Sequence, residues 1–102
     1  MADTHLVKIM PSAVRDLRAI AKYIRRHSPQ NAASVCEQLL REIDGLGFMP
    51  QRFKQVGRSR KRKCSVHAVH VRPYIIYYRV ETDAVIVFNV RHGARRQPRH
   101  FD

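Results

Sequence analysis

Two apolar runs dominate the second half of the chain, and a short polar segment joins them. Residues 74–80 and 84–90 are rich in Tyr, Ile and Val, which favour the pleated surface of a packed sheet. Residues 81–83 between them are Glu, Thr and Asp, and Asp and Thr are common in turns. The pattern predicts a β-hairpin.

Helical spacing replaces this pattern in the first half. The short apolar run 5–10 predicts a first strand, which ends at Pro11 because proline lacks a backbone amide donor. Two helices then follow, one from Pro11 and one from Pro29 with Ser28 as its cap, and Pro50 lies just beyond the second. They should form a hairpin that packs its apolar stripes on the sheet. The stripe residues are Val14, Leu17, Ile20, Ala21 and Ile24, then Ala32, Val35, Cys36, Leu39, Leu40, Ile43 and Leu46.

Residues 47–63 have no apolar periodicity and contain seven Lys and Arg without an acid. This composition predicts a mobile basic loop, and both a solubilising linker and an anion-binding segment fit it. A further strand is expected over 65–71, with Arg72 and Pro73 turning the chain into Tyr74. The order strand, helix, helix, strand, strand, strand predicts an α+β fold whose last three strands form an antiparallel meander.

Charge narrows the choice of partners. The chain has 102 residues, the size of a single domain, and its 20 Lys and Arg against 8 Asp and Glu give a net charge of +12. Such a surface favours nucleic acid, an acidic protein or an anionic membrane. No apolar run approaches the roughly 18 residues of a membrane span, and the first residues do not form a signal peptide. We therefore expect a cytoplasmic protein, without a disulfide framework and with Cys36 as a buried thiol.

Histidines and cations supply the candidate chemistry. Cys64, His67 and His70 have a metal-like spacing, but residues three apart on a strand point to opposite faces, so we expect no metal site. Glycine-rich phosphate loops and nucleophile motifs are absent, so no cofactor is predicted. Acid–base cleavage of RNA stays open if a base, an acid and a cation converge at one rim, and the candidates are His70, His92, Arg95 and His100. Each histidine could equally be a hydrogen-bonded structural residue.

The tyrosine-rich strand 72–80, the run 85–90 and the His-Gly-Ala-Arg segment 92–95 together resemble the ParE branch of the ParE/RelE toxin superfamily. The strand and helix pattern of the first half agrees, so the resemblance covers nearly the whole chain. It implies one toxin domain over residues 1–102, from a type II toxin–antitoxin module of the plasmid-stabilising kind. The implied partners are an acidic ParD-like antitoxin, which folds along the toxin in a hetero-oligomer, and DNA gyrase, which ParE-type toxins poison by binding rather than by chemistry.

The resemblance also assigns positions within the superfamily. Ribonucleases of the RelE type carry a functional arginine where this chain has His70, a second one matched by Arg95, and a catalytic tyrosine where this chain has Phe101. Phenylalanine has no hydroxyl to act as acid or base, so two of three groups are missing and gyrase inhibition is favoured. A ribosome-dependent or free ribonuclease and a basic nucleic-acid-binding module are the alternatives. Many ParE-like sequences also have an arginine near the position of His67.

The basic residues are the predicted binding residues, although the cationic side of the first helix could equally be an ordinary solvated face. For the antitoxin they are Arg15, Arg18, Lys22 and Arg79, and for the target or an anion they are Arg58, Arg60, Lys61, Arg62, Lys63, Arg95, Arg96 and Arg99.

Overall fold

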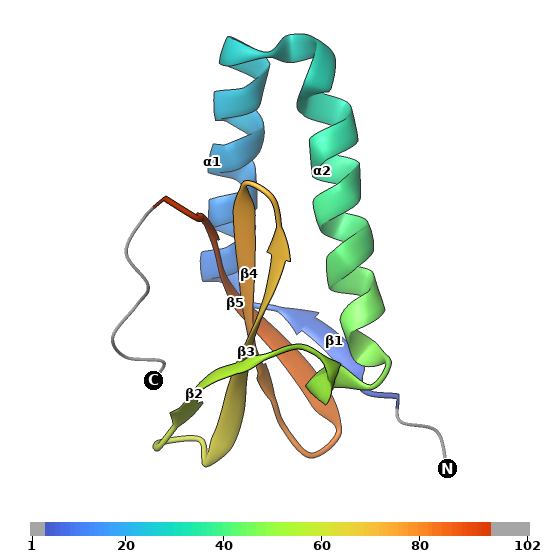
Figure 1. The fold of residues 1–102 in the computed structure, drawn as a ribbon, viewed down its shortest axis with the longest axis vertical. Helices are drawn as coiled ribbons and strands as arrows, with labels where there is room; N and C mark the ends of the chain where they lie inside the picture. The colour runs from blue at the N-terminus through green and yellow to red at the C-terminus, as the bar shows by residue number, and fades with distance from the viewer. Residues whose placement is uncertain (1–3, 95–102) are drawn as a thin grey trace.

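A helical hairpin packs on one face of a five-stranded sheet in the computed structural model, which describes residues 4–94 (Figure 1). The sheet has the order β1-β5-β4-β3-β2, with β1 parallel to β5 and the other neighbours antiparallel. This arrangement confirms the predicted α+β class. The elements are β1 (Leu6–Ile9), α1 (Pro11–His27), α2 (Pro29–Asp44), the 3-10 turns η1 (Gly45–Gly47) and η2 (Pro50–Arg52), β2 (Gln55–Ser59), β3 (Cys64–Val71), β4 (Tyr74–Val80) and β5 (Ala84–His92).

Both helices begin at a proline, as predicted, because the first turn of a helix does not use the missing amide. Ser28 occupies the N-cap position of α2, but its hydroxyl accepts a hydrogen bond from the Asn31 side chain (2.7 Å) instead of capping a helix amide. The Ser28 amide donates to Ile24 O at the end of α1 (2.7 Å). Ser28 therefore closes the first helix while the second one starts.

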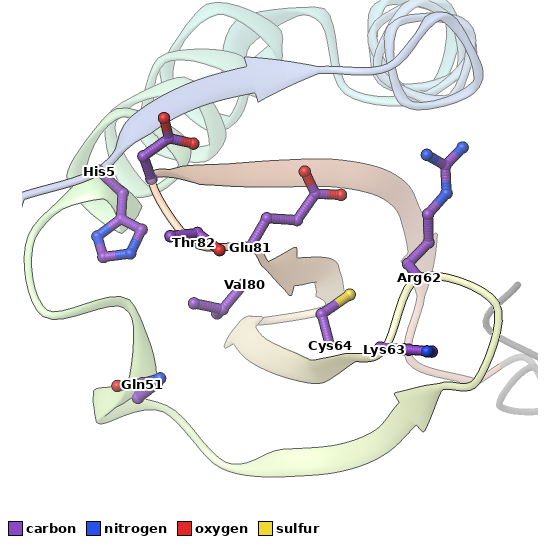
Figure 2. Close-up of a pocket in the computed structure, with 9 residues that line it drawn as sticks. His5, Gln51, Arg62, Lys63, Cys64, Val80, Glu81 and Thr82 are labelled. Atoms are coloured by element: carbon purple, nitrogen blue, oxygen red, sulfur yellow. The ribbon is translucent and has the colours of Figure 1, made fainter.

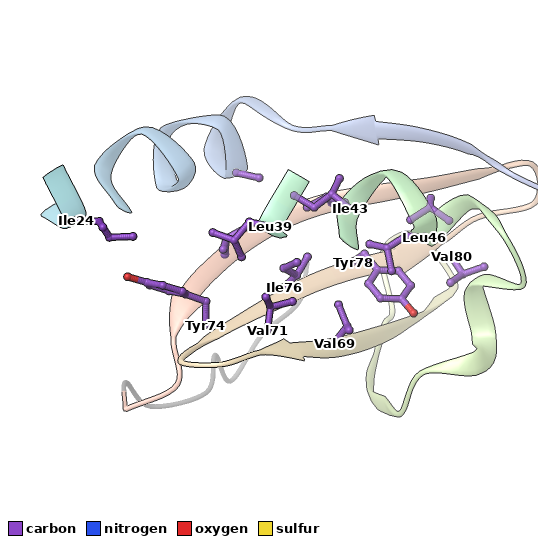
Figure 3. Packing of buried hydrophobic residues seen from close by; sticks show 14 of the residues in the cluster. Ile24, Leu39, Ile43, Leu46, Val69, Val71, Tyr74, Ile76, Tyr78 and Val80 are labelled. Carbon is purple, nitrogen blue, oxygen red and sulfur yellow. The ribbon is translucent and has the colours of Figure 1, made fainter. Parts of the chain in front are cut away.

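The core lies between the helices and the inner face of the sheet (Figure 3). Leu39 and Ile43 from α2 meet Ile76 and Tyr78 from β4, and all four are at most 2% exposed. The Tyr78 hydroxyl donates to Pro50 O (2.6 Å), so the chain around η2 is fixed to the middle of the sheet. Burial raises the pKa of Tyr78 to about 12, although nearby Arg52 acts in the opposite direction.

Part of the predicted α2 stripe lies outside the core. Leu40 is 52% exposed, and Cys36 is only half-buried rather than the buried thiol that we expected. Both line a groove between α2 and β1, and α2 covers the inner sheet with only part of its apolar side. A wide apolar stripe thus serves the core and an exposed surface together.

The prediction of a mobile basic loop over residues 47–63 is wrong. This segment contains η1's last residue, η2 and the strand β2, which pairs antiparallel with β3 from Gln55↔His67 to Ser59↔Cys64. The antiparallel meander therefore has four strands rather than three. Because β2 is an edge strand held by backbone pairing, it needs no alternating apolar residues, and cations on an edge discourage unwanted pairing. His67 Nδ1 donates to Phe53 O (2.8 Å) just before β2 and fixes its start.

A bulge in β5 determines which side chains face the helices. Tyr77 pairs with Asn89 while Tyr78 pairs with Val87, so Phe88 is an extra residue. The freed Val90 amide donates to the Asp16 carboxylate of α1 (3.0 Å), and Asn89 Nδ2 donates to the same oxygen (3.4 Å). The bulge shifts the alternation, so that Val87 and then Val90 join the core.

Candidate functional site

His70 and His92, two of the candidate acid–base groups, lie at the same end of the sheet but on opposite faces. His70 is paired across the strands with Ile75, whereas His92 is paired with Tyr74, which belongs to the helix-facing core. The His92 ring packs edge-on against Tyr74 at 5.7 Å, and its Nδ1 accepts from the Ala94 amide (3.0 Å). The structure does not bring the two histidines together. Arg95 and His100, the other two candidates, lie outside the described residues.

Arg91 is a cation that sequence reasoning missed. It is paired with Ile75, which is in turn paired with His70, so all three side chains form one row on the outer face of the sheet. Within residues 4–94, Arg91 Nε is buried and makes no hydrogen bond. Arg91 also lowers the pKa of Tyr77, although burial of that ring raises it by more. Simple alternation would place Arg91 with the inward Val85 and Val87, so only the bulge reveals this row.

The metal-like trio is divided by strand alternation. Cys64 and His70 lie on one face of β3 and His67 on the other. Both His67 ring nitrogens are engaged, with Phe53 O and with Ser65 Oγ (2.9 Å). Among residues 4–94, no group of three His, Cys, Asp or Glu side chains is placed to hold a metal ion. Burial raises the pKa of Cys64, and the opposing charge of Arg79 offsets this only in part. Cys64 is therefore a protonated thiol near neutral pH.

Five of the eight cations predicted to bind the target or an anion lie at a structured turn between β2 and β3, while Arg95, Arg96 and Arg99 lie outside the described residues. We call this β2–β3 turn the basic turn, and it consists of Arg58 and residues 60–63, all exposed. The buried Ser59 hydroxyl accepts from the Arg62 amide (3.1 Å), and Arg58 Nη2 donates to Lys63 O (3.4 Å). Lys63 has a φ of 53°, which lies in the left-handed region. The cations are therefore carried by a defined hairpin turn.

A cavity of about 600 Å³ separates the basic turn from the β4–β5 turn (Figure 2). Arg62 and Lys63 line one side, and Glu81 and Asp83 belong to the opposite turn. His5 also lines this cavity, and its Nδ1 is buried without a hydrogen bond inside the described part of the chain. The walls thus carry both signs of charge.

The four predicted antitoxin-binding cations do not share a surface. Arg15, Arg18 and Lys22 are exposed on α1. Arg79 is only 7% exposed, with its guanidinium 5.5 Å from the Phe88 ring and its Nε 3.7 Å from Glu81 Oε2. Arg79 is consequently a buried cation within the sheet, apart from the exposed cations of α1.

The groove between α2 and β1 is an apolar surface that was not predicted. It encloses about 740 Å³ and is lined by Val7, Ile9 and Leu40 among others, with Glu37 and Asp44 also in its wall. Leu40 and Ile9 are 52% and 38% exposed. Because β1 ends the strand order, no strand among residues 4–94 pairs with its outer edge along this α2–β1 groove, although the His5 amide just before it donates to Gly47 O (2.7 Å). The apolar stripe of α2, wider than the core requires, was the signal for it.

Neither helix in residues 4–94 has the length and hydropathy to cross a membrane. The family model for the ParE toxin of the type II toxin–antitoxin system parDE matches residues 7–97. Among solved structures, the chain is similar to one described as the chromosomal ParDE TA system from P. aeruginosa, with a TM-score of 0.68 and 16% sequence identity. That similarity covers 89% of this chain and 98% of the other. None of the curated proteins matches this sequence.

Proposed function

Because the chain belongs to the ParE toxin family, we propose that it acts by binding DNA gyrase and blocking it, and that an acidic ParD-like antitoxin neutralises it. The family match over residues 7–97 carries this proposal. The sheet rim supports it, since His70 and His92 face opposite sides and do not form an acid–base pair. Inhibition by binding requires no such pair. The expected setting is the cytoplasm, where gyrase acts.

A supercoiling assay with purified gyrase, ATP and relaxed plasmid tests the proposal. We expect supercoiling to stop and cleaved plasmid to accumulate once the reaction is denatured. Circular dichroism first establishes that the added protein is folded. Full gyrase activity in the presence of folded protein would refute gyrase as the target. Cleavage of message in a translation reaction, lost in Arg95→Ala, would instead identify a ribonuclease.

The proposed target contacts are the exposed cations of the basic turn, together with Arg95, Arg96 and Arg99, which lie outside the described residues. Cations of this kind mainly accelerate association and set its salt dependence. Inhibition of gyrase should therefore weaken as salt rises.

We place the antitoxin on the α2–β1 groove and on the basic side of α1. The groove offers exposed apolar side chains beside a strand edge that no other strand among residues 4–94 covers, which suits a segment that folds on binding. Arg15, Arg18 and Lys22 would attract its acidic residues. Arg79 belongs to this surface only if the antitoxin also reaches the sheet, because its side chain is buried.

Leu40→Glu tests this placement, with Gln38→Glu as a control of equal charge on the same helix. Both residues are exposed, so both variants should fold. We expect Leu40→Glu to weaken binding of a ParD-like antitoxin by more than about tenfold, since it puts a charge in an apolar contact. Gln38→Glu should change binding by less than about threefold. Equal effects would exclude the groove as the main contact.

A further inference from the structure

The basic turn carries five cations and no acidic residue within one hairpin. Between Asp44 and Glu81 the sequence has no acidic residue, while it has nine Lys and Arg. Four of these cations are consecutive at positions 60–63, and a fifth, Arg58, is adjacent in space through its bond to Lys63 O. The turn therefore presents a dense positive charge at one end of the molecule.

The turn is held in shape before any partner arrives. Ser59 is fully buried and accepts the Arg62 amide, and Ser59 also pairs with Cys64 at the base of the turn. Behind it, His67 and Phe53 fix the start of β2. A rigid turn loses little conformational entropy on binding, so its charges are suited to a partner with regularly spaced charges.

Its residue types discriminate between classes of polyanion. Residues 58–63 contain no aromatic ring and no exposed apolar side chain. Protein interfaces take most of their affinity from such anchors, so toward gyrase these cations would mainly speed association, and single-stranded nucleic acids are bound largely by stacking on aromatic rings. Positions 60–63 also lack the neutral polar side chains that contact RNA 2′-hydroxyls. Contacts to the phosphates of duplex DNA require only cations.

We propose that the basic turn binds the phosphate backbone of duplex DNA directly, without gyrase. Glu81 and Asp83 face the turn across the 600 Å³ cavity. Of these two carboxylates, Glu81 already has a cationic neighbour, because its Oε2 lies 3.7 Å from Arg79 Nε. Arg60, Lys61 and Arg62 supply the main phosphate contacts, while Arg58 and Lys63 maintain the turn. This binding does not depend on the DNA sequence, and the proposal holds whether or not gyrase is the target.

Fluorescence anisotropy with a labelled DNA duplex of about 30 base pairs, between about 50 and 200 mM salt, tests the proposal. The triple variant Arg60→Ala, Lys61→Ala, Arg62→Ala should bind more weakly, and the slope of log affinity against log salt should fall by about three. The matched control is Arg25→Ala, Arg26→Ala, Arg72→Ala. It removes the same charge from exposed residues near the tip of the helical hairpin and the β3–β4 turn, away from the basic turn (Figure 1).

The control should keep a slope within about one of the unchanged protein, since each phosphate contact contributes about 0.9. Thermal melting followed by circular dichroism establishes that both variants are folded. Equal loss in both variants would show that net charge, rather than the turn, is responsible, and would overturn the proposal. Undetectable DNA binding at about 50 mM salt would also overturn the proposal. Binding to an RNA duplex of equal length as tight as that to DNA would overturn the choice of DNA.

Discussion

The two edges of the sheet are built for different neighbours. At one edge, β1 lies beside the α2–β1 groove, where Leu40 and Ile9 are exposed next to charged residues of both signs. At the other edge, β2 is irregular between Gln55 and Gly57 and ends in the basic turn. An apolar edge can accept a protein segment through backbone pairing and side-chain burial. A short, bulged and cationic edge discourages strand pairing and favours anions. The two proposals thus place protein binding at one edge of a small domain and phosphate binding at the other.

Ile43→Ala should give the largest change in stability. Comparing it with Leu40→Ala separates the core side of α2 from the side that faces the α2–β1 groove. Ile43 is 2% exposed while Leu40, one turn away, is 52% exposed. We expect Ile43→Ala to lower the free energy of unfolding by about 2 to 5 kcal/mol, because it leaves a cavity. Leu40→Ala should lower it by about 0.5 kcal/mol. Urea denaturation measures both, and similar losses would mean that Leu40 serves stability rather than binding.

Alkaline pH should destabilise the protein through its buried tyrosines. Burial raises the pKa of Tyr78 from 10.0 to about 12, and it also raises those of Tyr74 and Tyr77. Between these values the unfolded chain has lost the proton that the folded chain keeps. Stability is therefore complete below pH 10 and falls as the pH approaches 12, by roughly 2 to 3 kcal/mol for Tyr78. Denaturation at stepped pH, followed by tyrosinate absorbance, measures this loss, and constant stability up to pH 12 would contradict it.

Tyr78→Phe isolates the support of the β2 edge. The substitution keeps the ring but removes the donor to Pro50 O, so the carbonyl before β2 loses its partner. We expect a loss of about 1 to 2 kcal/mol in the free energy of unfolding. Amide exchange should accelerate in β2 more than in β1. Equal acceleration at both edges would show that η2 does not specifically support β2.

Lys63→Gly should have the smallest effect and the opposite sign. Lys63 adopts a φ of 53°, which glycine tolerates without strain. We expect the protein to gain about 0.5 kcal/mol in stability, because the relieved strain exceeds the added entropy of the unfolded chain. Lys63→Ala removes the same charge but keeps the strain, so it should give no gain. Thermal melting compares the two, and a gain in both would attribute the change to charge.

The sequence predicts the helices and apolar strands well because periodicity reports burial directly. Pro11 and Pro29 mark both helix starts, and the hairpin turn lies at residues 81–83, where it was expected. It does not reveal β2, because Gln55–Ser59 is held by backbone pairing to β3 and carries little apolar signal. Nor does it reveal the bulge at Phe88, which depends on Asp16 accepting the Val90 amide from 74 residues away. The candidate site was predicted least well, because the faces on which Arg91 and His92 lie depend on that bulge.

The parallel pairing of β1 with β5 has a consequence for how the protein is made. Leu6 is paired with Ala84, so the first strand remains without its neighbour until 78 further residues have left the ribosome. At about 5 to 20 residues per second, this delay is roughly 4 to 16 s. The helical hairpin emerges early, but α2 can pack on β4 only once residues 74–80 have also emerged. A truncated product that stops before β5 cannot complete the sheet, so the folded toxin forms only after the last strand has been translated.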